Sequence, residues 1–174
     1  ETMEFILQSG FEAGSVDDAT IAASMEQQQL FWTLREDMSG SQKPEGASIK
    51  HDISVPVGSI PDFIRAADAA VLALVPDARI VNFGHMGDGN LHYNISQPVG
   101  WEAKAFFDHE AAVHEAVYKV VGSFSGSISA EHGIGQMKRD KLAQIKDPTA
   151  LQMMHAIKSA LDPYAIMNPG KVIG

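Results

Sequence analysis

Apolar and polar residues alternate with two different periods along the chain. A helical period, with an apolar residue every three or four positions, predicts helices over residues 27–34, 61–74, 102–121 and 148–161, with a further helical stretch from residue 138. A period of two predicts strands over residues 49–57 and 91–95, an apolar and β-branched run predicts a strand over residues 79–83, and a short strand is expected over residues 127–130. This order favours an α+β fold, in which helices cover one face of an antiparallel sheet and the other face is free to line a site.

Composition and charge narrow the class of protein. A chain of 174 residues, 45% of them hydrophobic, can form one ordinary core, and its formal charge of −9 would repel a nucleic-acid backbone. No apolar run approaches the roughly 20 residues that cross a bilayer, and no signal peptide is recognisable, so we expect a soluble, cytoplasmic chain. Because the chain has no cysteine, histidine and carboxylate side chains are the metal ligands it offers.

A strong hairpin signal, Asp88-Gly89, separates the second and third expected strands. With a two-residue turn there, His85 lies directly opposite His92, and their Cβ atoms are roughly 5 Å apart. That separation suits two imidazole nitrogens bound to one metal ion. Because strand side chains alternate, Asn94 projects to the same face as His92. The hairpin therefore predicts a polar face of two histidines and one asparagine.

Other residues bear on whether this face binds a metal. Two histidines near a turn are also common as exposed or hydrogen-bonded side chains. Three glycines around the first histidine indicate unusual backbone angles or a close approach by another chain segment or a ligand; they are Gly84, Gly87 and Gly89. Glu131 follows the fourth expected strand and would complete a set of two histidines and one carboxylate. If that strand continues, His132 points to the opposite side from Glu131, which gives the two residues different roles.

Three motifs resemble one known family. They are Asn82–Asn94 (NFGHMGDGNLHYN), Ser129–Gly135 (SAEHGIG) and Leu161–Lys171 (LDPYAIMNPGK). In order and spacing they are similar to the C-terminal region of the FAD-linked oxidase family, which includes D-lactate dehydrogenase, D-2-hydroxyglutarate dehydrogenase and the glycolate oxidase flavoprotein subunit. The resemblance extends from about Leu30 to the end of the chain. It implies a flavin-dependent enzyme that oxidises a D-2-hydroxy acid to a 2-oxo acid.

The resemblance also implies which residues contact the substrate. Arg35 and Lys50 would bind its carboxylate, since an arginine can bind a carboxylate bidentately and a lysine adds a point charge. Considered alone, either residue is more often a surface charge. Ser39 is a further candidate contact, and Asn94 would orient the substrate or a ligand histidine. His132 would accept the hydroxyl proton, because an imidazole titrates near neutral pH.

Two cofactors follow from the same resemblance. His85, His92 and Glu131 would bind a divalent metal, which we expect to be zinc, with manganese or iron as alternatives. The metal would act as a Lewis acid on the substrate hydroxyl. FAD would accept the hydride from the substrate, and Asn168 would lie near the flavin ring.

The family's FAD-binding domain is N-terminal, and nothing in this chain resembles its glycine-rich segment. The first residue is Glu1 rather than methionine, so we expect a fragment of a longer protein. The resemblance implies that the fragment begins inside the family's C-terminal region and lacks an initial strand or helix. Residues 1–136 would form a ferredoxin-like cap domain that binds substrate and metal, and residues 137–174 a helical tail that packs toward the absent FAD domain. The expected partners are a small 2-hydroxy acid, the protein's own FAD domain and an unidentified electron acceptor, and a homodimer is also compatible with the sequence.

Two other functions fit parts of the sequence. A metal- or carboxylate-binding module that acts only with a partner needs no catalysis, and the fragment alone is expected to be inactive. A metal hydrolase with a zinc-bound water fits the ligand set but gives no role to Arg35, Lys50 and the C-terminal motif together. A flavin spectrum that is bleached by a D-2-hydroxy acid would separate the dehydrogenase from both alternatives.

Overall fold

The computed structural model describes residues 2–173, and the chain divides into two compact units, Glu1–Glu45 and Gly46–Gly174. The elements of the first unit are α1 (Thr2–Glu12), α2 (Met25–Asp37) and the short 3-10 helix η1 (Gly40–Glu45). Ser24 caps α2, since its hydroxyl accepts a hydrogen bond from the backbone N–H of Gln27 at 3.2 Å. Helix α1 was not predicted. The expected domain boundary at residue 137 stays a prediction.

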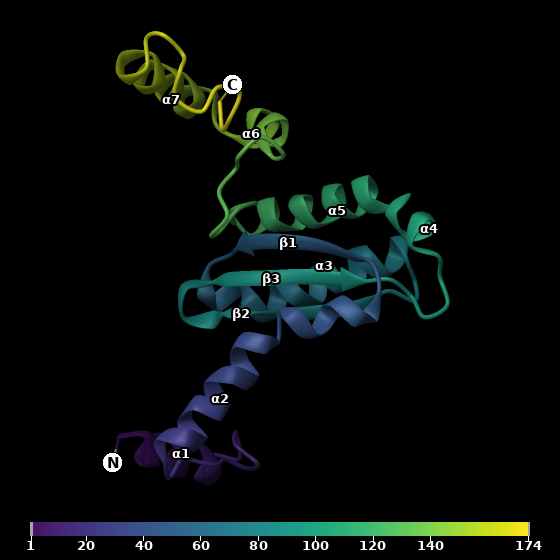
Figure 1. Ribbon diagram of the computed structural model, residues 1–174, viewed down its shortest axis with the longest axis vertical. Coiled ribbons are helices and arrows are strands. Elements are labelled where there is room, and N and C mark those ends of the chain that lie inside the picture. Colours follow the sequence, from purple (N-terminus) through teal and green to yellow (C-terminus); the bar gives the residue numbers. More distant parts are fainter. Residues whose placement is uncertain (1, 174) are drawn as a thin grey trace. The chain divides into compact units, whose positions relative to one another are not determined.

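The second unit is built on a three-stranded antiparallel sheet with the order β1–β3–β2 (Figure 1). Its elements in chain order are β1 (Ser48–Ser54), η2 (Val57–Ser59), α3 (Ile60–Leu74), β2 (Arg79–His85), η3 (Met86–Asp88), β3 (Asn90–Ser96), α4 (Ala103–Phe107), α5 (Glu110–Ser123), α6 (Arg139–Ile145) and α7 (Pro148–Leu161). Both β1 and β2 pair antiparallel with β3, so β1, α3 and β2 form a split βαβ unit with β3 in the middle. The predicted α+β fold is confirmed.

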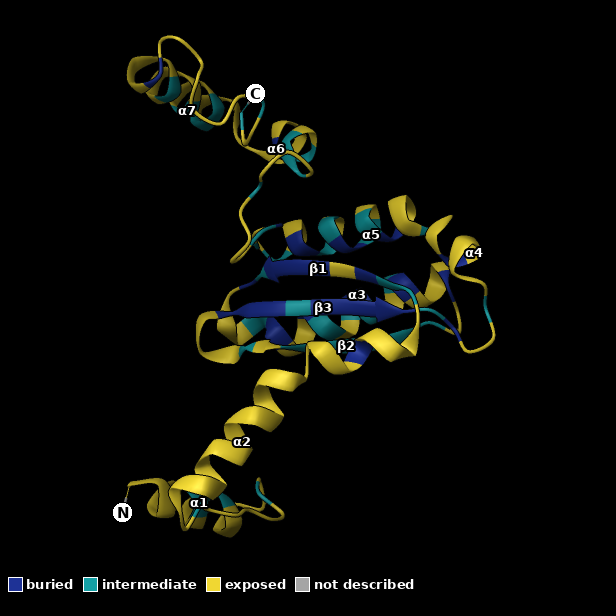
Figure 2. Cartoon of the chain, in the orientation of Figure 1, coloured by how far each residue is buried: buried dark blue, intermediate teal, exposed yellow. Residues whose placement is uncertain are grey.

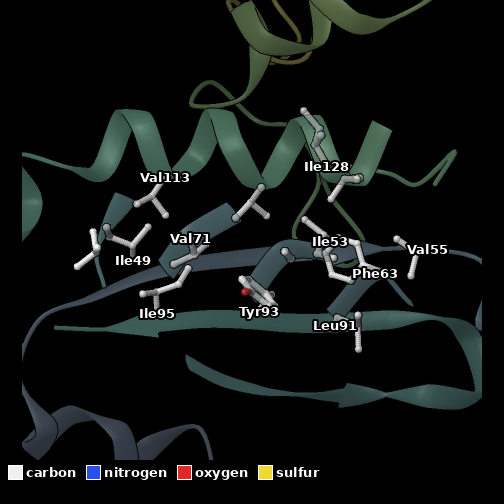
Figure 3. Close-up of a cluster of buried hydrophobic side chains, with 14 of the residues drawn as sticks. Ile49, Ile53, Val55, Phe63, Val71, Leu91, Tyr93, Ile95, Val113 and Ile128 are labelled. Carbon is white, nitrogen blue, oxygen red and sulfur yellow. The ribbon is translucent and has the colours of Figure 1, made fainter. Parts of the chain in front are cut away.

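Helices α3 and α5 cover one face of this sheet. Their buried residues recur at helical spacing and are Ile60, Phe63, Ala67, Val71, Val113, Val117 and Val121. From the strands, alternate residues point to the same face and include Ile49, Ile53, Leu91, Tyr93 and Ile95. Figure 3 shows side chains of this core, among them Phe63, Tyr93 and Val113, gathered between the strands and the helices, and Figure 2 shows the opposite sides of the helices exposed. Each fully buried aliphatic or aromatic side chain stabilises the fold by about 1.5–3 kcal/mol.

A buried polar cluster lies on the same helix-covered face. His51 of β1 is 2% exposed, and its Nδ1 lies 2.9 Å from the carbonyl oxygen of Tyr93. Its Nε2 lies 2.8 Å from Nδ1 of His114 on α5. Because the carbonyl only accepts, His51 Nδ1 is the donor, and its Nε2 therefore accepts from His114. Burial, and then the neighbouring His114, lowers the pKa of His51 to about 3, so this imidazole is neutral at physiological pH.

Three predicted elements differ from the structure. The strand expected over residues 49–57 ends at Ser54, and Val57 begins the 3-10 helix η2. The helix expected over residues 102–121 is two helices, α4 and α5, because the N–H of His109 bonds the carbonyl of Phe106 and tightens the last turn of α4. The strand expected over residues 127–130 is a single bridge between Ser54 and Ser127, because β1 ends at Ser54 and offers no further partner. Within residues 2–173, no helix combines the length and the apolar character needed to cross a membrane.

Candidate active site

The β2–β3 hairpin has a different register from the one expected. His85 pairs with Asn90 rather than with His92, so the prediction that the two histidines lie directly opposite is wrong. The reason is the turn, which is one turn of 3-10 helix at Met86–Asp88 followed by Gly89 with a φ of 79°, and which is therefore longer than two residues. The register differs by an even number of residues, so both histidines still project from the same face. Their ring centroids are 6.0 Å apart.

Two of the three glycines in this motif are required by close approach. A Cβ on Gly89 would lie 2.0 Å from the carbonyl oxygen of Val55, and one on Gly84 would lie 2.3 Å from the carbonyl oxygen of Asn90. For these positions the prediction of a close backbone approach is confirmed. At Gly87 a Cβ would meet no described atom within 4 Å, so no other chain segment requires a glycine there.

Glu131 lies between the two imidazoles. Its Oε1 is 3.3 Å from Nε2 of His85, and its Oε2 is 3.8 Å from Nε2 of His92. One ligand atom from each of the three side chains falls within 4.8 Å of the others. The three side chains remain 20–46% exposed, so a further ligand can approach from solvent. Two imidazoles and one carboxylate with an accessible position are typical of a metal site that also binds substrate.

A buried carboxylate on β1 holds the loop that carries Glu131. Asp52 is 4% exposed and accepts hydrogen bonds from three consecutive backbone N–H groups, those of Ala130 at 3.2 Å, Glu131 at 3.1 Å and His132 at 2.9 Å. The hydroxyl of Ser129 donates to the same carboxylate at 3.3 Å. Burial opposes the charged form of Asp52, but the backbone donors of His132 and Glu131 outweigh it and lower the pKa of this carboxyl.

His132 lies beside the candidate metal ligands rather than on the opposite side. Its side chain is 72% exposed, and its Nδ1 is 3.8 Å from Oδ2 of Asp52. Ligand atoms of His132, Glu131 and Asp52 lie within 4.8 Å of one another, so the expectation that His132 and Glu131 point to opposite sides is wrong. The expectation assumed a continuous strand, and this segment is a bend instead. The ring centroid of His132 is 6.3 Å from that of His92.

Three residues of the site were not predicted: Asp52, Asn90 and Lys138. Asn90 is 4% exposed, and its side-chain Nδ2 donates a short hydrogen bond to Oε1 of Glu131. Lys138 donates to the carbonyl oxygens of Asp52 at 3.3 Å and Ile128 at 2.7 Å, and burial lowers its pKa. For Asp52 a signal was available, since strand alternation places it on the same face as Lys50, two residues earlier. The sequence contains no comparable signal for the other two.

Two of the expected substrate contacts share the site face of the sheet. Lys50 of β1 and Asn94 of β3 are paired, and antiparallel partners project to the same side. By the alternation of strand side chains, this is also the face of His92. Lys50 is exposed and Asn94 is buried. A cation and an amide therefore lie near the candidate metal ligands.

The other predicted site residues lie elsewhere in the chain. Arg35 is on α2 in the first unit, with its guanidinium carbon 5.5 Å from the centre of the Trp32 ring. Ser39 is exposed just after α2. Asn168 follows α7, is exposed, and adopts a left-handed φ of 47°, with its carbonyl accepting from the N–H of Lys171 at 3.2 Å. The functional roles of these residues stay predictions.

The sequence matches the family model described as FAD linked oxidases, C-terminal domain, over residues 1–172. The chain belongs to this family. It is 44% identical to D-2-hydroxyglutarate dehydrogenase of Stutzerimonas stutzeri (strain A1501) over 161 residues, which are 92% of this chain and 34% of that protein. It is also 37% identical over 174 residues to the mitochondrial D-2-hydroxyglutarate dehydrogenase of Arabidopsis thaliana (99% and 30% coverage), and 35% identical over 173 residues to that of Danio rerio (99% and 31%).

This FAD-linked oxidase domain spans about a third of the length of the curated relatives it matches. The predicted family is confirmed, and with it the link to FAD. Two of these relatives are named as mitochondrial, and the cytoplasmic location expected for this chain stays a prediction.

Proposed function

We propose that this chain is the substrate- and metal-binding part of a flavin-dependent dehydrogenase that oxidises a D-2-hydroxy acid to a 2-oxo acid. The observation that carries the proposal is the convergence of His85, His92 and Glu131 on one point beside His132. The names of the relatives make D-2-hydroxyglutarate the first substrate to test. D-lactate and glycolate carry the same 2-hydroxy-carboxylate group and are the alternatives.

The donor set fits a divalent metal. His85 and His92 offer imidazole nitrogens and Glu131 offers a carboxylate oxygen, which zinc accepts readily and which manganese and iron also accept. The hydrogen bond from Asn90 to Glu131 orients the carboxylate from outside the ligand set, as is usual around metal ligands. When bound, the metal would supply Lewis-acid polarisation of the substrate hydroxyl.

The formal charge of −9 repels an anionic substrate, so a nearby cation is needed to bind its carboxylate. Lys50 supplies one on the same face of the sheet as the metal ligands, next to Asn94, whose amide would orient the substrate. Arg35 and Ser39 of the first unit are proposed as further contacts with the acid. A bidentate arginine would select a planar carboxylate over a neutral group.

His132 is proposed as the general base. The carboxylate of Asp52 faces its Nδ1 at 3.8 Å, which favours a proton on that nitrogen and leaves the lone pair of Nε2 for the substrate hydroxyl proton. The ring is 72% exposed and is therefore accessible to a bound acid. FAD, bound mainly by an N-terminal domain, would accept the hydride from the substrate Cα.

The tail is proposed to pack against that FAD domain, with Asn168 near the flavin ring. It exposes several large apolar side chains, namely Met137, Leu161, Tyr164 and Ile166. Exposed apolar side chains of this size would be covered by a domain that packs against the tail. Truncation after residue 136 should therefore weaken flavin retention in the full-length protein.

Anaerobic reduction of the flavin in the full-length protein tests the proposed function. D-2-Hydroxyglutarate should bleach the flavin spectrum, and His132→Ala should slow the bleaching by about 10²–10⁴-fold while metal content stays at the wild-type value. His109→Ala, which removes an imidazole at the N-cap of α5 beside Trp101, is the matched control and should leave the rate unchanged. An unchanged rate in His132→Ala would refute the assignment of the base. Failure of every D-2-hydroxy acid tested to bleach the wild-type flavin would favour the non-catalytic binding module.

A further inference from the structure

We propose that Asp52 and Asn90 are positioning residues that hold Glu131 in the geometry the metal site requires. Asp52 fixes the backbone of the loop, and Asn90 fixes the carboxylate itself. The inference rests on the proposed function, because it concerns support for the same metal site. Neither residue needs to touch the metal or the substrate for this role.

The loop that carries Glu131 has little regular structure of its own to fix it. Its pairing with the sheet ends at the bridge between Ser54 and Ser127, four residues before Glu131. Beyond that bridge, the N–H groups of residues 130–132 all point at the carboxylate of Asp52. Successive backbone N–H groups directed at one anion form a well-defined concavity, so the negative charge of Asp52 sets the path of the loop.

Asp52 is better assigned to this support than to a metal. Together with Glu131 and His132 it could form a second set of ligands within 4.8 Å. However, its Oδ2 accepts from three backbone N–H groups and one hydroxyl, and its Oδ1 accepts from the N–H of Glu131. The side chain is also 4% exposed. A carboxylate whose oxygens are already occupied by donors has little capacity left for a cation.

Asn90 acts on the side chain of Glu131 from the neighbouring strand. Its Nδ2 donates to Oε1 of Glu131, and its own backbone N–H is held by Oδ1 of Asp88 at 3.1 Å. The amide oxygen of Asn90 is buried and meets no donor among the described residues. A buried acceptor without a donor destabilises a fold by about 1–3 kcal/mol. The side chain of Asn90 therefore has a cost in stability, and its hydrogen bond that orients Glu131 explains its presence better than a purely structural role does.

The zinc affinity of the full-length protein tests this inference independently of turnover. Equilibrium dialysis with elemental analysis should show zinc bound about 10–100-fold more weakly by Asp52→Asn, the range usual for outer-shell substitutions. The reason is that the asparagine side chain carries no charge and has one acceptor oxygen instead of two, so it holds the N–H groups of the loop less firmly. Asp68→Asn is the matched control, because Asp68 accepts from the hydroxyl of Tyr93 on the helix-covered side of the sheet. It should lower stability but leave zinc affinity within about twofold of wild type, since it touches no ligand.

The possible outcomes distinguish a failure of the positioning role from a failure of the proposed metal site. If Asp52→Asn does not fold, as judged by circular dichroism, Asn90→Ser tests the same support, because it removes the donor to Glu131 and keeps the loop anchor. Wild-type zinc affinity in either folded variant overturns the positioning role. If the wild-type protein itself retains no zinc, manganese or iron, the proposed metal site fails instead.

Discussion

Replacing the buried His51 with asparagine should make the stability of the fold less dependent on pH. Burial and the neighbouring His114 lower the pKa of His51 to about 3 in the folded chain, from 6.5 in an unfolded one. Between these two values the unfolded chain binds a proton that the folded chain does not, so the free energy of unfolding falls as the pH falls. From pH 7.5 to pH 5, the loss from this one residue is about 2 kcal/mol.

Urea unfolding monitored by the fluorescence of Trp101 measures this loss. A Trp32→Phe background confines the signal to the second unit, and EDTA removes any contribution from bound metal. Between pH 7.5 and pH 5 the chain with His51 should lose about 2 kcal/mol more than His51→Asn, whatever the substitution does to stability at pH 7.5. His155→Asn removes an exposed imidazole and should keep the original slope. If the free energy of unfolding depends on pH equally with and without His51, the argument that burial lowers the pKa of His51 is refuted.

Two further predictions concern the backbone around the site and use the same urea titration. Gly89→Ala should lower the free energy of unfolding by about 2 kcal/mol or more, because the residue has a left-handed φ of 79° and its methyl group would lie 2.0 Å from a carbonyl oxygen. Gly87→Ala should change it by less than about 0.5 kcal/mol, and equal effects at the two positions would contradict the close approach. Lys138→Met should cost about 1–3 kcal/mol, because two carbonyl oxygens lose their donor. Lys146→Met, at an exposed position, should change stability by less than about 0.5 kcal/mol. A similar loss in both lysine variants would contradict the role of Lys138 as the donor to these two carbonyl oxygens.

Local signals in the sequence predicted some elements well. Helix α7 was expected over residues 148–161 and is observed at Pro148–Leu161, since Asp147 caps it by accepting from the N–H of Ala150 at 3.0 Å. The shared face of His85 and His92 was also predicted correctly despite the wrong register. Strand side chains repeat every two residues, so an even shift moves residues along the face without turning them over.

Tertiary contacts decided the features that the sequence did not reveal. The hairpin turn is longer than expected because the carbonyl of Gly89 accepts from the N–H of Val55, a residue far from it in the chain. The support of Glu131 by Asp52 joins residues 79 positions apart, and no local pattern encodes such a pair. The short bridge at Ser127 depends on where its partner strand ends. In each case the deciding hydrogen bond forms only once the sheet is assembled.

Metal analysis tests most directly whether His85, His92 and Glu131 bind one divalent ion. The full-length protein should contain about one zinc, manganese or iron ion per chain after dialysis against metal-free buffer. His85→Asn should lose that ion, because it removes one of three ligands, whereas His155→Asn should retain it. Full retention of the metal by a folded His85→Asn variant would contradict the assignment of the site.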